Sequence, residues 1–281
     1  MKKIVLSILV VMTATCSFGQ LMYNDSSTNT STAVYAGILA GPAKSMNDGS
    51  IKSFGALRAG GMVTWAPNKW SSIYGLGAVE TDKSGATTPF SLFGLTVSPA
   101  KSVSLTVGKI GTPMTRLRPL PTTGAGQFEP WTKRQILGSA LGGMIGINTK
   151  NGYSLNTGAF VRGNDVSTEL SLGNAHVQLA GYYMTQSKVF GGAFNCTYKW
   201  FSTTLVYNDK KNTGMLDVIQ ISKKNHTSLY SDIGFTPDSW NMIRGEWGVF
   251  TTTSMKYIST LLGIGYAKET NSIKGYLFIH L

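Results

Sequence analysis

The sequence is poor in cysteine and in charged residues, and beyond its N-terminus it lacks long apolar runs. Of its 281 residues, two are cysteine and 14% are charged, whereas a soluble globular protein usually carries about 25% charged residues. The mean hydropathy is +0.02, so the missing charge is not replaced by one continuous apolar block. Alternation of apolar and polar residues would give this combination. A protein anchored by several transmembrane helices is excluded, because each helix needs about 20 consecutive apolar residues.

Acidic residues are also few, 13 against 25 lysines and arginines. Residues 1–19 have the three parts of a secretory signal peptide: Lys2 and Lys3, an apolar run over 4–12, and a small-x-small site that ends at Gly19. Acylation of Cys16, as in a lipoprotein, is the alternative, but the residues before it do not fit that motif. We therefore expect an exported mature chain of residues 20–281. Its single cysteine, Cys196, excludes an internal disulfide.

Most of the mature chain alternates with a period of two, which is typical of half-buried β-strands. In the segment FGALRAGGMVTW (54–65) one face is apolar and the other carries Arg58, and residues 153–162, 166–172 and 177–183 follow the same pattern. Counting such runs predicts about sixteen strands, with fourteen as the alternative. The predicted strands begin near residues 32, 54, 70, 88, 102, 135, 153, 165, 175, 188, 200, 215, 226, 240, 253 and 272.

The lengths of the connections favour one architecture. Compact turns follow every second strand, whereas the intervening connections, at 41–53, 80–87, 111–134 and 209–214, are predicted to be longer. A soluble sandwich has no reason to place all its short turns at one end, but a transmembrane barrel does. Aromatic residues also gather at the predicted strand ends, as in the two girdles of a membrane barrel. We therefore predict an all-β fold, a transmembrane antiparallel β-barrel formed by residues 20–281.

Two segments, TWAPNKWSSIYGLG and TVSPAKSVSLTVGK, share a strand, an (Ala/Ser)-Pro-x-Lys turn and a second strand that contains glycine. This unit resembles the strand–turn–strand unit of outer-membrane porins and porin-like barrels. The resemblance implies location in the cell outer membrane, contact with membrane lipid and lipopolysaccharide, and a homotrimer as the assembly to test. It also implies a water-filled channel for passive diffusion of small hydrophilic solutes. The alternative is a non-conducting barrel that anchors or docks other envelope or secretion proteins.

The inner face of such a barrel would carry its polar residues, since sixteen strands leave an aqueous interior. Five charged residues are the candidate pore-lining residues: Arg58, Arg162, Glu169, Arg244 and Glu246. By the same parity the lumen also receives Asn156, His176, Gln178, Asn195, Asp232 and Lys274. The alternative is that these residues only solvate a wet interior and pair with one another. Lys109, Lys256 and Asp217 have the parity of the lipid face, where a charge is costly.

The segment GKIGTPMTRLRPLPTTGAGQFEPWTKRQ (108–135) differs from the rest of the chain. It holds four of the nine prolines, which keep it from joining the sheet as a strand. In porins, which this sequence resembles, the loop after the fifth strand folds into the channel and narrows it. The candidate constriction residues are then Arg116, Arg118, Glu129, Lys133 and Arg134, and rings of Arg or Lys favour anions. The alternative is a loop that lies over the rim.

The sequence offers little for catalysis. The mature chain has three histidines, none beside a Gly-x-Ser-x-Gly motif or with the spacing of a metal site. We expect no enzyme activity, no metal and no cofactor. The positive charge does not indicate nucleic-acid binding in an exported chain; it favours lipid phosphates, or small anionic solutes drawn in by electrostatic steering.

Overall fold

The computed structural model describes residues 21–25, 27, 29–82, 87–116, 132, 137–209, 213–222, 226–236, 241–254 and 259–280. The predicted signal peptide and four of the five candidate constriction residues, Arg118, Glu129, Lys133 and Arg134, lie outside these residues. Arg116 is included as part of a short 3-10 helix, η1 (Met114–Arg116).

Seventeen strands make up nearly all of the described chain. The first nine are β1 (Leu21–Asp25), β2 (Thr30–Ser45), β3 (Ile51–Asn68), β4 (Ser71–Asp82), β5 (Thr87–Ala100), β6 (Val103–Ile110), β7 (Ala140–Asn148), β8 (Ser154–Arg162) and β9 (Asp165–Gly173). The rest are β10 (Val177–Met184), β11 (Val189–Tyr198), β12 (Phe201–Asn208), β13 (Thr213–Ser222), β14 (Thr227–Phe235), β15 (Met242–Ser254), β16 (Ser259–Ala267) and β17 (Ser272–His280).

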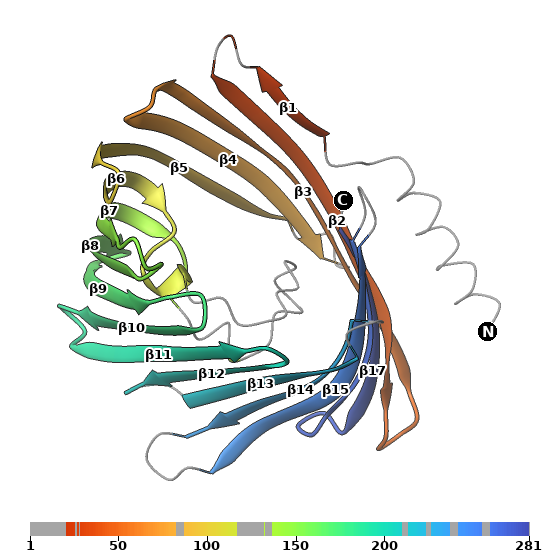
Figure 1. Cartoon of the computed structure of the whole chain (residues 1–281). Helices are drawn as coiled ribbons and strands as arrows, with labels where there is room; N and C mark the ends of the chain where they lie inside the picture. Colours follow the sequence, from red (N-terminus) through yellow and green to blue (C-terminus); the bar gives the residue numbers. More distant parts are fainter. Residues whose placement is uncertain are drawn as a thin grey trace.

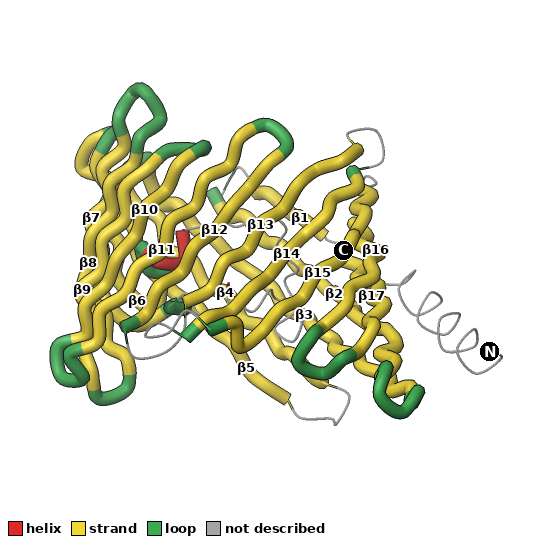
Figure 2. Tube along the Cα trace, turned by 90° about the horizontal axis from the view of Figure 1, so that it is seen from below, coloured by secondary structure: helices red, strands yellow, loops and turns green. Residues whose placement is uncertain are grey.

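The strands β2 to β17 form a ring of antiparallel pairs. Each pairs with its neighbours in the sequence, and β17 pairs with β2 from Ser272↔Ser45 to His280↔Gly37. Figure 1 looks along this ring, and Figure 2 shows from the side that the strands are tilted. An antiparallel barrel of about sixteen strands, as predicted from the alternation, is therefore confirmed. Because β17 pairs with β2, the strands β2 to β17 have none of the free edges that an open sheet would expose.

The junction of β17 with β2 is less regular than the other pairs. No register partner is recorded between Lys274↔Ala43 and Leu277↔Ala40, where β2 carries Pro42. Proline has no N–H to donate across the ladder, which explains the gap. Beyond the end of β17, β1 pairs with the first residues of β2, from Leu21↔Val34 to Asp25↔Thr30. The sequence did not predict β1.

The two faces of the ring differ as the alternation predicted. In β9, Asp165, Ser167, Glu169 and Ser171 are buried, while Val166, Leu170 and Leu172 are exposed. The exposed residues lie on the outer face, where nearly every strand carries large apolar side chains. Aromatic side chains stand exposed near both strand ends, among them Trp65, Trp70, Tyr153, Tyr198 and Trp200 at one end and Tyr183, Phe190 and Tyr207 at the other.

The connections lie at two opposite ends of the ring (Figure 2). The turn end carries those after β1, β3, β5, β7, β9, β11, β13 and β15, and the loop end carries those after β2, β4, β6, β8, β10, β12, β14 and β16. The predicted long connections at 41–53, 80–87 and 209–214 are wrong. Their strands continue further, so that β2 and β3 leave only 46–50 between them. The connection from β6 to β7, over 111–139, is the long one. No described helix is long and apolar enough to span a bilayer.

Candidate functional site

A buried ion pair lies on the inner face of β8 and β9. Arg162 Nη2 is 2.6 Å from Glu169 Oε1, and Glu169 is fully buried while Arg162 is 13% exposed. The Nε of Arg162 donates to Ser167 Oγ, and its Nη2 donates to the carbonyl oxygen of Gly138 at 2.8 Å. Since these hydrogen bonds hold the guanidinium and the carboxylate in one geometry, the pair is tightly fixed on the wall.

The long connection is attached to this ion pair. The backbone N–H of Met114 donates to Glu169 Oε2 at 3.3 Å, and Thr112 Oγ1 accepts from Arg162 Nη2. Met114 is fully buried in a cluster with four residues of β10, β11 and β12, namely Ala180, Tyr182, Ala193 and Val206. All four lie on the inner face, because they share register with inner-facing residues of the neighbouring strands. The start of the connection therefore packs against the inner wall.

A second attachment lies near the end of the same connection. Thr132 is fully buried, and both its N–H and its hydroxyl donate to Asp232 Oδ1 in β14, at 3.1 and 2.5 Å. Asp232 pairs with Leu216 and Glu246 on the inner face. By pairing order, β14 is eight strands beyond β6 in a ring of sixteen. Thr132 of this connection therefore contacts the wall half-way round the ring from β6.

A charged network occupies the inner face of β15 and β17. Glu246 Oε2 is 3.1 Å from Lys274 Nζ and 3.4 Å from Arg244 Nη2, and Arg244 Nε is 3.0 Å from Glu269 Oε1. These side chains are 18–28% exposed. The inner face is therefore accessible to water here, in contrast to the fully buried carboxylate of Glu169.

Tyr230 links this network to the wall behind it. Its hydroxyl donates to Glu246 Oε1 at 2.9 Å. Its ring occupies the space above two glycines: a Cβ on Gly248 would come within 2.6 Å of Tyr230 Cε1, and one on Gly265 within 2.4 Å of its Oη. Glycine at both positions is what allows an aromatic ring to lie flat on the inner face.

The structure brings together four of the five predicted wall charges, as two pairs: Arg162 with Glu169, and Arg244 with Glu246. Arg58 lies in β3 at an inner-face register, opposite Gly37 and Glu80. His176, predicted to face the lumen, instead lies exposed in the turn between β9 and β10. Sequence reasoning missed Met114, Thr132 and Glu269 as partners. The prolines, the basic residues and the lack of alternation marked the connection that holds Met114 and Thr132, whereas no pattern marked Glu269.

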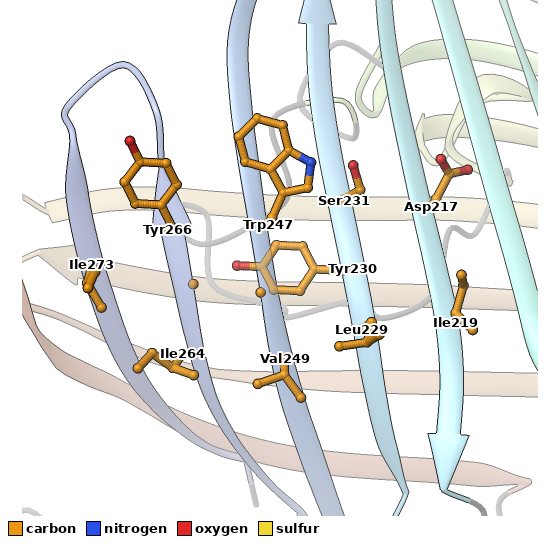
Figure 3. A pocket seen from close by; sticks show the side chains of 12 residues that line it. Asp217, Ile219, Leu229, Tyr230, Ser231, Trp247, Val249, Ile264, Tyr266 and Ile273 are labelled. Carbon is orange, nitrogen blue, oxygen red and sulfur yellow. The ribbon is translucent and has the colours of Figure 1, made fainter.

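Two charges have the outer-face parity that the sequence predicted. Lys109 donates to Ser91 Oγ at 3.2 Å. Asp217 lies in one row with Ser231, Trp247 and Tyr266 along a shallow groove of about 580 Å³ on the outer face of β13–β17 (Figure 3). The rest of that groove is almost entirely apolar side chains. Among the described residues, no group of three or more His, Cys, Asp or Glu side chains could hold a metal ion.

No family model matches the sequence, and no curated protein matches it either. Solved structures do match the fold. A Salmonella typhi OmpF in complex with daunomycin has a TM-score of 0.64 at 8% identity, covering 92% of this chain and 99% of that one. A mutant of the Rhodobacter blastica porin has a TM-score of 0.58 at 9% identity, covering 89% and 99%. The chain therefore has the β-barrel fold of porins.

Proposed function

We propose that this protein is an outer-membrane porin, a water-filled channel through which small hydrophilic solutes diffuse passively, with a mild preference for anions. The observation that carries the proposal is the double attachment of the 111–139 connection. Glu169 holds its start, and Asp232, half-way round the ring, holds Thr132. A connection fixed at two distant points of the inner wall narrows the interior without needing to fill it.

The distribution of exposure supports a conducting interior. The network of Arg244, Glu246 and Lys274 faces inward and is still 18–28% exposed. An inner wall that solvent reaches on one side of the ring fits an aqueous path beside the connection. If the interior were filled by a solid plug, the side chains of this network would be as fully buried as that of Glu169.

The anion preference rests on where the uncompensated charge lies. The wall acids Glu169 and Glu246 are paired with wall cations. The proposed constriction residues are Arg116, Arg118, Lys133 and Arg134, with Glu129 as their one acid. Cationic side chains in a narrow neck favour anions, and Arg suits phosphate or carboxylate through its bidentate fork.

Single-channel recording in planar bilayers tests the proposal. We expect discrete conductance steps and, in a KCl gradient, a reversal potential displaced toward that of chloride. The double variant Arg116→Ala, Arg118→Ala should move the reversal potential toward zero and leave the channel conducting. A folded protein that gives no steps would overturn the porin proposal and favour the barrel that anchors other envelope proteins. Unchanged selectivity in the double variant would instead place these arginines outside the constriction.

A further inference from the structure

The turns at one end of the barrel carry exposed cations. Lys69, Lys101, Lys150 and Lys199 lie in four of the described turns at the turn end, and all four are exposed. His176 and His226 lie exposed in two more. The sequence places Lys223 and Lys224 in the connection after β13 and Lys256 in that after β15, outside the described residues. These lysines are spread around the whole ring.

Acidic side chains are almost missing from the same end. Among the residues that the structure describes, Asp25 of β1 is the only acid within three residues of a turn-end connection. At the loop end, in contrast, cations alternate with acids. Lys268 is followed by Glu269, Asp48 lies between Lys44 and Lys52, and Lys188 follows Ser187, whose hydroxyl donates to Asp165. Within the part of the chain that the structure describes, acidic side chains therefore leave most of the positive charge at the turn end without compensation.

Two of these lysines lie against aromatic rings at the strand ends. Lys69 Nζ is 4.9 Å from the centre of the Trp70 ring, and Lys199 Nζ is 5.0 Å from that of Tyr198. Tyr198 belongs to the outer face of β11 and is exposed. Both ammonium groups thus lie against aromatic side chains at the strand ends, and that of Lys199 lies on the outer face of the ring. Aromatic rings of a membrane barrel lie at the level of the lipid headgroups.

We propose that the turn end is a docking surface for the phosphate groups of anionic phospholipids in the adjoining leaflet. Exposed lysines, left without acidic neighbours and held at headgroup level, attract a negatively charged surface within a Debye length. The inference rests on the proposed location in a membrane, but it does not depend on conduction. Because the lysines lie in different turns of the ring, each would attract anionic lipid on its own side of the barrel.

Lipid selectivity measured by electron paramagnetic resonance tests this. The mature protein is reconstituted in phosphatidylcholine with trace spin-labelled phosphatidylglycerol or phosphatidylcholine, and the ratio of their association constants is determined. We expect a several-fold preference for phosphatidylglycerol that 1 M salt removes. The quadruple variant Lys69→Gln, Lys101→Gln, Lys150→Gln, Lys199→Gln should bring the ratio close to one.

A matched variant controls for net charge. Lys44→Gln, Lys52→Gln, Lys188→Gln and Lys268→Gln remove four exposed lysines from the loop end, and this variant should keep most of the preference. Equal losses in both variants, or no loss in the first, would overturn the proposal. If the turn-end variant keeps its lipid preference but shifts the reversal potential, these lysines act on solutes at the channel mouth. A protein that binds lipid as expected but does not conduct would contradict only the porin proposal.

Discussion

At the scale of single residues, the burial of a charged side chain in the ring decides how much it contributes to the stability of the fold. Glu169 is fully buried and accepts hydrogen bonds from Arg162, Ser167 and Met114. The side chain of Glu269, in contrast, is 28% exposed and has one cationic partner, Arg244. A buried pair that loses one member leaves the other charge without compensation, which costs about 3–5 kcal/mol. An exposed pair contributes about 0–1 kcal/mol.

Glu169→Ala should therefore lower the free energy of unfolding by about 3–5 kcal/mol, because Arg162 would stay on the wall without its carboxylate. Urea unfolding in phospholipid vesicles, followed by tryptophan fluorescence, measures the change. Glu269→Ala serves as the control and should cost about 1 kcal/mol or less. Equal effects for the two variants would contradict the difference in burial.

Asp48, in the connection between β2 and β3, should give the barrel a small dependence on acid pH. The Ser50 N–H, which donates to Asp48 Oδ1 at 2.9 Å, and the hydroxyls of Ser45 and Ser50 lower the pKa of Asp48 from 3.8 to about 2. Because the pKa of Asp48 is lower in the folded protein, its ionised carboxylate stabilises the fold at pH values above the unfolded pKa. This stabilisation is lost as the pH falls through the folded pKa. The difference in melting temperature between the wild type and Asp48→Asn should therefore be constant above about pH 5 and shrink toward pH 2. A difference that grows with acidity would contradict this assignment.

At the scale of elements, the connection from β6 to β7 depends on the wall for its place. Thr132 donates twice to the buried Asp232, and a hydrogen bond to a charged group contributes about 1.5–3 kcal/mol. Thr132→Val keeps the shape but removes the hydroxyl. Detachment should become roughly tenfold or more frequent, so trypsin should cleave between residues 116 and 134 several-fold faster in the folded protein.

The control for this experiment is Thr203→Val, which removes a hydroxyl from β12 at the outer-face register opposite Asp217. Its cleavage rate should equal that of the wild type. A wild-type rate in Thr132→Val as well would mean that the Thr132 hydroxyl does not hold the connection.

The strands themselves were largely predictable, because period-2 alternation is a local signal that the pleat imposes. The predicted starts at 165 and 272 coincide with the structure, and that at 54 differs by three residues. The largest error, 253 instead of Ser259, arose because β15 continues through Thr251–Thr253 and Ser254, whose hydroxyl side chains do not alternate in polarity. The contacts of the site were less predictable. Thr132 and Asp232 are 100 residues apart, and no local pattern marks such a partnership.

At the scale of the whole molecule, the ring depends on one pairing between the two ends of the chain. All other neighbours in the ring are joined by a connection in the sequence, but β2 and β17 meet only through their ladder. That ladder is interrupted at Pro42, and β1 supplements it along the first residues of β2. The stability of the barrel as a unit therefore depends on this junction more than on any hairpin.

A disulfide across the junction tests the ring directly. Ala40 and Leu277 are register partners, and directly opposite residues in antiparallel strands have Cα atoms about 4.5–5.5 Å apart, which suits a disulfide. In a Cys196→Ser background, Ala40→Cys with Leu277→Cys should form a disulfide within one chain. This disulfide should raise the temperature at which the barrel unfolds, which is seen as a change of mobility on gels. Ala40→Cys with Leu179→Cys, on β10, should form no such bond, since β10 is eight strands beyond β2. Failure of the first pair to cross-link in the folded protein would mean that β2 and β17 do not meet, and the ring would have to be abandoned.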